Sequence, residues 1–298
     1  MGTLTIMVGI AGSGKDSIIK KLYNKNEVIL SSDEIRVELY GYEDQTHNRE
    51  VFTEMNRRAK EAGKAGSHVI YNATNLNRSR RVGLCQEMKK YFNRIEVVAC
   101  ICPISTLLKR NKTRKERHLP EDKLKQMIRS IQLPVLYEYP YDNITYHYTT
   151  EDIDNELEKL DTLNDYEQYN KYHSETLGKH IMRVATACVS NEKAHMAAMY
   201  HDLGKPFCKT VDEEGYYHFI GHSAVSAYMY ISDLMSYGKE LSADNLEIMF
   251  MIEVHDYIFS FNMDFEKMKK KMLNKYKGLS DEFWLGLEML TKADRLRP

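Results

Sequence analysis

The sequence predicts an α/β domain with a parallel sheet flanked by helices (residues 1–160), followed by an all-α domain (residues 161–298). In the first part, short β-rich apolar runs alternate with helical patterns, which is typical of a parallel sheet. In the second part, strand patterns almost vanish and helical periodicity dominates. The length of 298 residues suits two domains of ordinary size better than one.

The first domain contains five predicted strands, which are Thr3–Val8, Val28–Ser31, His68–Ala73, Ile95–Ile101 and Asn143–Tyr148. Helical patterns such as Glu50–Ala65 and Arg78–Phe92 separate them. An acidic helix over Glu151–Leu160 and a polar stretch over Asp161–Gln168 are expected to close this domain, which places the boundary near residue 160.

The second domain is predicted to be helical over about 176–190, 192–202, 221–237, 242–254, 264–276 and 280–296. Its one strand signal lies over Lys209–Phe219, where Asp-Glu-Glu-Gly separates two short β-rich runs. This pattern predicts a hairpin.

The composition is that of a soluble globular protein, with 43% hydrophobic and 29% charged residues. No eighteen apolar residues run together and the N-terminus lacks the basic region of a signal peptide, so neither a membrane span nor export is expected. An odd number of scattered cysteines, five, suits reduced thiols in a cytoplasmic protein. The net charge of −1 gives no general attraction to nucleic acid, although residues 110–117 are strongly basic.

A glycine-rich loop follows the first predicted strand and opens a helix, which is the context of a phosphate-binding P-loop. Backbone N–H groups and the helix N-terminus would hold the phosphates of ATP or another NTP, and the lysine would reach the β- and γ-phosphates. The residues expected at this site are Gly9, Gly12, Ser13, Gly14, Lys15, Asp16 and Ser17. Asp16 stands where Ser or Thr usually holds Mg²⁺, and a carboxylate is also a good Mg²⁺ ligand.

Asp33 follows the second strand, at the sheet edge where doubly wound folds place their chemistry. A carboxylate there can accept the proton of an attacking hydroxyl, and Arg36, one helical turn later, can hold an anionic part of the acceptor. The alternative is that Asp33 only caps a helix.

Arginines Arg110 and Arg114 begin a basic segment that ends at Pro120. Arginines on a closing lid can neutralise charge on a transferred phosphoryl group while water is excluded. The alternative is an ordinary solvated helix face.

Together these segments resemble the 5′-hydroxyl polynucleotide kinase family of P-loop phosphotransferases, over about residues 3–150. The motifs that carry the resemblance are the P-loop, Ser-Asp-x-x-Arg at 32–36, Ala-Thr-Asn-Leu-Asn at 73–77 and Arg-Asn-x-x-Arg at 110–114. The resemblance implies that Lys15 binds the NTP phosphates, Asp33 is the general base on the 5′-hydroxyl, Arg36 contacts the acceptor phosphate, and Arg110 and Arg114 are lid residues. The family often has an acidic residue just before the Thr-Asn, whereas Asn72-Ala73 stands there in this chain.

The second domain concentrates histidines and aspartates at spacings that suit paired metals. Adjacent imidazole and carboxylate groups at the end of a helix can serve one centre, and a bridging carboxylate can hold two ions close together. The residues in this pattern are His173, His180, His201, Asp202, His218, His222, His255 and Asp294.

This pattern resembles the HD phosphohydrolase superfamily over about residues 165–298. The resemblance implies that one metal is held by His180, His201, Asp202 and Asp294. His222 and His255 would bind a second ion with Asp202 bridging, and Lys205 would stabilise charge on the leaving phosphate. His173 and His218 lie within or beside the family motifs. Imidazole ligands favour transition metals such as Mn²⁺, Ni²⁺, Co²⁺ or Fe²⁺ over Mg²⁺, which we expect in the kinase domain.

The pair of domains resembles fused kinase–HD enzymes that heal RNA ends. This implies RNA (or DNA) ends as partners, with an RNA ligase acting downstream and no membrane. One alternative is a small-molecule nucleoside or nucleotide kinase joined to a nucleotide phosphohydrolase in salvage. The other is a non-catalytic sensor in which ATP binding shifts the helical domain.

Overall fold

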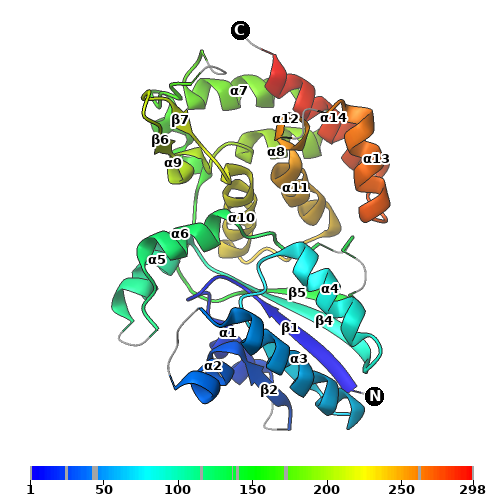
Figure 1. Ribbon diagram of the computed structural model, residues 1–298. Coiled ribbons are helices and arrows are strands. Elements are labelled where there is room, and N and C mark those ends of the chain that lie inside the picture. The colour runs from blue at the N-terminus through cyan, green and yellow to red at the C-terminus, as the bar shows by residue number, and fades with distance from the viewer. Residues whose placement is uncertain are drawn as a thin grey trace. The chain divides into compact units, whose positions relative to one another are not determined.

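The computed structural model describes residues 2–23, 26–41, 46–114, 117–135, 137–138, 141–170, 174–260 and 263–296. Its contacts divide the chain into two compact units (Figure 1). The first unit comprises Met1–Met127 and Glu138–Thr150, and the second comprises Ile128–Tyr137 and Glu151–Pro298. Apart from Ile128–Tyr137, the two units divide after Thr150, somewhat before the predicted boundary at residue 160.

The first unit is built on a five-stranded sheet in the order β2-β3-β1-β4-β5, with parallel pairing between all neighbours. Leu4 of the central strand, for example, lies opposite Val69 on one side and Ile95 on the other. The strands are β1 (Gly2–Val8), β2 (Val28–Ser31), β3 (Val69–Asn72), β4 (Phe92–Ile101) and β5 (Asn143–Tyr148). The prediction of a parallel α/β sheet is confirmed.

Side chains of the sheet alternate between two cores, as the period of two along a strand requires. Leu4 and Ile6 pack in a core with Met55 of α3, while Met7 packs on the other face with Ile18 of α1. The helices of this part of the chain are α1 (Lys15–Leu22), α2 (Ser32–Tyr40), α3 (Asn48–Lys64), α4 (Arg78–Met88), α5 (Ile104–Thr113) and α6 (Glu121–Arg129).

The strand order places a topological switch point beside β1. Strands β2 and β3 lie on one side of β1 within the sheet, and β4 and β5 lie on its other side. Doubly wound sheets bind ligands outside the carboxyl ends of their strands at such a point. The loop that follows Val8 therefore lies where a ligand is expected.

In the described residues of the second unit, the regular structure is helical apart from one hairpin. Its elements are the 3₁₀ helix η1 (Leu157–Leu163), α7 (Leu177–Ala187), α8 (Glu192–Tyr200), α9 (Lys205–Cys208), β6 (Thr210–Val211), β7 (Tyr217–His218), α10 (His222–Ser236), α11 (Ala243–Val254), α12 (Tyr257–Ser260), α13 (Phe265–Lys275) and α14 (Asp281–Arg295). Helix α8 packs against α7, α11 and α14, and its buried residues Ala194, Ala197 and Ala198 allow this close approach. The predicted helices and the antiparallel hairpin are confirmed.

The predicted acidic helix over Glu151–Leu160 is wrong for its first half. Residues 151–156 have no helical structure, and η1 begins only at Leu157. Instead, the backbone N–H of Glu156 donates to both carboxylate oxygens of Asp233 at 3.0 and 2.9 Å, and the Ser232 hydroxyl donates to Asp154 at 2.9 Å. These bonds to α10 offset the loss of helical hydrogen bonds in this segment.

All five cysteines are buried and free, as the reduced-thiol prediction expects. Among the helices that the structure describes, none is both long and apolar enough to cross a membrane.

Candidate functional sites

Thr149 and Arg110 donate hydrogen bonds to the backbone of the predicted phosphate loop between β1 and α1. The Thr149 hydroxyl donates to the Ser13 carbonyl at 2.8 Å, and the Arg110 guanidinium donates to the carbonyls of Gly12 at 3.0 Å and Thr149 at 2.8 Å. Gly14 has a φ of 85°, and a Cβ there would lie 2.8 Å from the Thr149 Cβ, so the position requires glycine. Arg110 thus shapes the loop, and its predicted contact with the nucleotide stays a prediction.

Lys15 begins α1 and folds back over the loop, where its Nζ donates to the carbonyls of Gly9 at 2.9 Å and Ile10 at 3.1 Å. Burial lowers the pKa of Lys15, and the nearby carboxylates of Asp16 and Asp33 act against that shift. The ammonium therefore lies within electrostatic reach of two other predicted site residues. The loop, Asp16 and Asp33 share one edge of the sheet.

Asp16 lies in the first turn of α1 and faces the end of β3. Its Oδ1 accepts a hydrogen bond from the Asn72 side-chain amide at 2.8 Å. Both residues belong to departures noted in the sequence: Asp16 stands in place of the usual P-loop hydroxyl, and Asn72-Ala73 stands where the resembled family often has an acidic residue. The structure brings Asp16 and Asn72 into contact. In this contact the negative charge belongs to Asp16 on α1, and the residue on strand β3, Asn72, is neutral.

Asp33 lies in the first turn of α2 without capping it. The N-cap is Ser31, whose hydroxyl oxygen accepts the Glu34 backbone N–H at 3.4 Å. Asp33 Oδ1 accepts from Arg36 at 3.2 Å, and Oδ2 lies 3.8 Å from Arg117 Nη1. The side chain of Asp33 is 43% exposed, so this carboxylate is both oriented and open to solvent. The alternative of a helix cap is wrong.

Arg36 is buried beneath Asp33, with only 2% of its surface exposed. Its guanidinium also donates to the Ser32 carbonyl at 3.3 Å and to Asn48 Oδ1 at 2.8 Å. These contacts orient Asp33, and the direct contact of Arg36 with an acceptor phosphate stays a prediction.

The basic segment after α5 is held at its base by Asn111. The Asn111 side chain donates to the Leu119 carbonyl at 2.8 Å and accepts the Leu119 N–H at 3.0 Å. Arg114 lies at the end of α5 and acts electrostatically on Lys15, while Arg117 adopts a left-handed φ of 58° near Asp33. Sequence reasoning noted the charge of Arg117 but gave it no place in the site.

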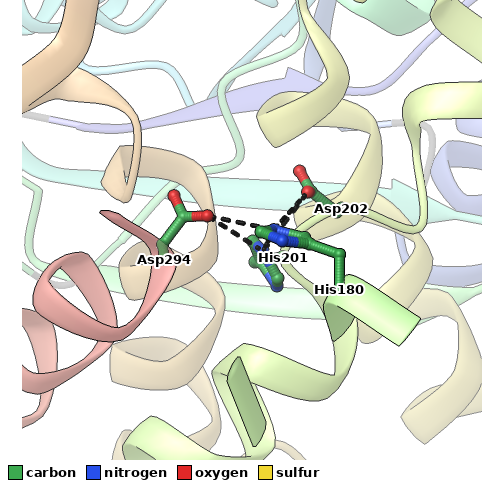
Figure 2. Close-up of side chains that lie close together, drawn as sticks. All are labelled: His180, His201, Asp202 and Asp294. Carbon is green, nitrogen blue, oxygen red and sulfur yellow. Dashed lines mark hydrogen bonds and ion pairs between the residues drawn. The ribbon is translucent and has the colours of Figure 1, made fainter. Parts of the chain in front are cut away.

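In the second unit, His180 of α7, His201 and Asp202 after α8, and Asp294 of α14 converge (Figure 2). The Nε2 atoms of the two imidazoles lie 3.2 Å apart. Asp202 Oδ2 lies 3.2 Å from His180 Nε2 and 3.3 Å from His201 Nε2, and Asp294 Oδ1 lies 3.0 Å from His180 Nε2. The structure therefore brings together all four residues predicted for the first metal.

A second group shares Asp202 through its other oxygen. Asp202 Oδ1 lies 3.1 Å from Nε2 of His222, which begins α10, and 3.9 Å from Nε2 of His255, which follows α11. The two Nε2 atoms lie 3.4 Å apart. One carboxylate thus faces two donor groups, which is the arrangement that a bridging ligand requires.

Three of these imidazoles have a backbone acceptor at the other ring nitrogen. Nδ1 of His201, His222 and His255 lies 2.7–2.9 Å from the backbone carbonyl three residues earlier, whereas His180 Nδ1 lies 3.1 Å from both Glu175 Oε1 and Arg183 Nη2. A backbone acceptor keeps the proton on Nδ1, which leaves the Nε2 lone pair free to bind a metal and fixes the orientation of the ring.

The donor set fits a transition-metal centre. Four Nε2 lone pairs and two carboxylates face one another in a buried space, an arrangement that needs a proton or a cation between the groups. Burial by itself lowers the pKa of His201, but the neighbouring carboxylates of Asp202 and Asp294 outweigh it and raise this pKa to about 10. The centre thus favours positive charge.

Lys205 and Gly204 complete the surroundings of Asp202. Lys205 is buried, and its Nζ lies 2.6 Å from Asp202 Oδ2 and 2.7 Å from Gln168 Oε1. A Cβ at Gly204 would lie 2.5 Å from the His222 carbonyl, so glycine allows α10 to approach the Asp202 turn. Lys205 therefore contacts the bridging carboxylate, and its action on a leaving phosphate stays a prediction.

Sequence reasoning missed the residues that hold His180 in place. Glu175 Oε1 accepts from Arg183 Nε at 2.8 Å, and Arg183 Nη1 donates to the Ala293 carbonyl at 3.0 Å, next to Asp294. The spacing of Arg183 three residues after His180 was the available signal.

Two weaker histidine predictions have different outcomes. His218 lies in the hairpin, where its Nε2 is 2.7 Å from Asp212 Oδ2, and it belongs to neither donor group. His173 lies outside the described residues.

Comparison with known proteins bears on the first unit. Residues 4–134 match the family model described as an AAA domain. This is less than half of the chain, and it agrees with a kinase-like P-loop fold, which implies an NTP and Mg²⁺. No curated protein matches significantly.

Three solved structures show partial likeness. A chain of the Pnkp1/Rnl/Hen1 RNA repair complex is 22% identical, with 42% of each chain covered and a TM-score of 0.38. A putative kinase from Chloroflexus aurantiacus is 18% identical over 51% of this chain and 89% of the other (TM-score 0.41), and a sugar kinase from Janibacter sp. is 14% identical over 50% and 85% (TM-score 0.37). These likenesses do not distinguish one kinase chemistry from another.

Proposed function

We propose that the chain heals RNA ends. The first unit would phosphorylate 5′-hydroxyl ends with an NTP, and the second would open 2′,3′-cyclic phosphates and remove 2′- or 3′-phosphates. The observation that supports the proposal is the presence of two candidate sites in one chain: a predicted phosphate loop beside an oriented carboxylate, and a group of imidazoles and carboxylates that shares Asp202. The products of RNA cleavage commonly carry the two kinds of end that these sites would correct.

In the kinase reaction, Asp33 would act on the acceptor hydroxyl. Its carboxylate takes the proton as the hydroxyl oxygen bonds to the γ-phosphorus, and the bond from that phosphorus to the β,γ-bridging oxygen breaks to release the nucleoside diphosphate. Arg36 holds Asp33 in this orientation, and Lys15 is expected to leave the loop carbonyls for the phosphates. Mg²⁺ would neutralise charge on the phosphates, with Asp16 as its protein ligand.

In the hydrolytic reaction, the donor groups would hold two transition-metal ions. Such ions supply Lewis-acid chemistry that activates water and polarises the phosphate. Asp202 contributes one oxygen to each group, and the backbone acceptors keep the imidazoles in place. The Lys205 ammonium contacts Asp202 Oδ2 and so orients this carboxylate.

The proposed partners are RNA ends, with DNA ends as the comparison substrate and an RNA ligase as the enzyme that would use the healed product. The kinase assay that tests this compares ATP turnover on a 5′-hydroxyl oligonucleotide, free nucleosides and simple sugars. The proposal expects at least a tenfold preference in kcat/KM for the oligonucleotide. A preference for nucleosides would support the salvage alternative, and nucleotide binding without transfer to any acceptor would support the sensor.

A further inference from the structure

Three tyrosine rings gather on the β6–β7 hairpin and on the segment before residue 171. Tyr169 stacks on Tyr216 with ring centroids 6.3 Å apart and tilts against Tyr217 at 5.8 Å. The Lys209 ammonium lies 3.4 Å from the centroid of the Tyr217 ring. We propose that this tyrosine platform (Tyr169, Tyr216 and Tyr217, with Lys209) binds the terminal nucleobase of the substrate of the second unit.

Exposure of the platform suits a stacking partner. Tyr169 is 63% exposed, far more than a structural ring requires, while Tyr216 and Tyr217 are partly buried. Every nucleobase has a π-face that stacks on such rings, and a neighbouring cation attracts the phosphate and the aromatic ring systems. The chemistry of the surface therefore matches a base with its phosphate.

The backbone at Tyr169 is held in an unfavourable conformation. Its φ of 27° lies in the left-handed region that side chains other than glycine rarely adopt. The Tyr217 N–H donates to the Tyr169 carbonyl at 2.9 Å and fixes this conformation against the hairpin. Strain of this kind collects at binding sites, where it presents a side chain in the orientation the ligand needs.

The platform adjoins the metal centre through Lys205. Gln168, next to Tyr169 in the chain, accepts from Lys205 at 2.7 Å, and Lys205 lies 2.6 Å from Asp202. Phe219, two residues after Tyr217, lies with its ring centroid 5.5 Å from the same ammonium. Both segments that carry the platform therefore also contact the residue beside Asp202, and Figure 1 shows the hairpin next to α9, which begins with Lys205.

The charges around the hairpin favour a single terminal nucleotide over a long strand. Its turn carries Asp212, Glu213 and Glu214, of which Asp212 pairs with His218 at 2.7 Å. These acidic groups would repel a polyanion that continued past the platform. The inference rests on the proposed phosphohydrolase function for placing the phosphate at the metal centre and the adjoining base on the rings.

Photocrosslinking tests the platform by the position of the bound base, whether or not the phosphate is released. The full chain is loaded with Mn²⁺ and irradiated with a short RNA that ends in a 3′-phosphate and carries 5-iodouridine either as its last base or well inside the strand. We expect the terminal probe, and not the internal one, to crosslink to peptides containing Tyr169, Tyr216 or Tyr217. Terminal crosslinks confined to other peptides would overturn the inference.

Binding of a fluorescent 3′-phosphorylated RNA to the same chain gives the second readout. Tyr169→Ala should raise the Kd about tenfold, as loss of one base stack does, and Tyr169→Phe should restore it. The matched control is Tyr237→Ala, which removes a tyrosine of 54% exposure at the far end of α10 from His222 and should leave the Kd unchanged. Equal Kd values for Tyr169→Ala and the parent would contradict the platform.

Hydrolysis of the same RNA separates the two proposals. If the chain crosslinks through the platform but releases no phosphate, the phosphohydrolase proposal fails and the platform stands. If phosphate is released with the same KM by Tyr169→Ala and the parent, and the platform peptides carry no crosslink, the platform fails and the phosphohydrolase stands.

Discussion

The two candidate sites differ in how completely the folded chain has assembled them. At the edge of the sheet, Lys15 bonds to loop carbonyls, Asp16 to an amide, and Asp33 remains 43% exposed. In the helical unit, His201 and Asp202 are buried, and their donor atoms already face one another from separate helices.

This difference follows from what each site would bind. Phosphate groups can be held by a flexible loop and by side chains that move from backbone partners to the ligand. A metal centre needs its donors fixed within a few tenths of an ångström, which buried helices and second hydrogen bonds provide. Substitutions at the sheet edge should therefore change catalysis and leave stability nearly unchanged, whereas substitutions at the proposed metal-binding residues should change both.

The largest effect is expected at the sheet edge, from Asp33→Asn. Loss of a general base should lower kcat for 5′ phosphorylation about 10²–10⁴-fold while the Kd for ATP stays within a factor of about two. The control is Glu34→Gln, which neutralises the neighbouring exposed carboxylate. A Glu34→Gln loss as large as that of Asp33→Asn would remove Asp33 from its role.

Removal of the bridging carboxylate is expected to break the second site. Asp202→Asn should abolish retention of transition metal in elemental analysis after dialysis and should lower release of phosphate at least 10²-fold, since the carboxylate serves both donor groups. The parent should show no hydrolysis with Mg²⁺ alone after chelation. His195→Ala, on α8 but outside both donor groups, is the control and should keep its metal.

The contact between Asp16 and Asn72 gives a sharper test of the sheet edge. Asp16→Ser should weaken Mg²⁺-dependent binding of ATP about tenfold and improve binding of metal-free ATP, because a carboxylate repels the phosphates unless a cation lies between them. Adding Asn72→Asp should restore Mg²⁺ dependence by returning the charge to the strand. A fluorescent ATP analogue titrated with and without EDTA measures both. No recovery in the double variant would mean that the two positions do not share one cation.

The smallest effect concerns stability of the helical unit, through Glu156. Burial raises the pKa of this carboxyl to about 7, with Asp154 adding to the shift and Lys159, whose Nζ lies 2.6 Å away, opposing it. The folded state therefore binds the proton more tightly than the unfolded chain, and stability falls as the pH rises from about 4.5 to about 7.

Glu156→Gln should remove this penalty. We expect an increase of about 1–3 kcal/mol in the free energy of unfolding at pH 8 and almost none at pH 4.5, measured by denaturant titration at both values. A variant that is less stable than the parent at pH 8 would show that the pair with Lys159 outweighs the cost of burial.

Much of the fold and of the two candidate sites could be predicted from the sequence because local residue patterns indicate them. Strands β2 and β5 were predicted to the residue, and the two donor groups were predicted from the resemblance of the histidine and aspartate motifs to the HD superfamily. Three features depend on contacts between distant segments, and the spacing of Arg183 after His180 was the one local signal that pointed to any of them. Arg110 turns inward because carbonyls of the loop and of Thr149 lie within its reach. Residues 151–156 stay non-helical because Asp233 accepts the Glu156 N–H, and Arg183 links Glu175 to the chain before Asp294.

The central claim is that one chain carries two separate phosphate chemistries. It is tested most directly by incubating an RNA with a 5′-hydroxyl and a 2′,3′-cyclic phosphate with ATP, Mg²⁺ and Mn²⁺, and reading both ends by mass spectrometry. The parent should change both ends, Asp33→Ala only the 3′ end, and the double variant His201→Ala and Asp202→Ala only the 5′ end. Loss of both reactions from either variant, in protein whose thermal unfolding shows it to be folded, would contradict the claim.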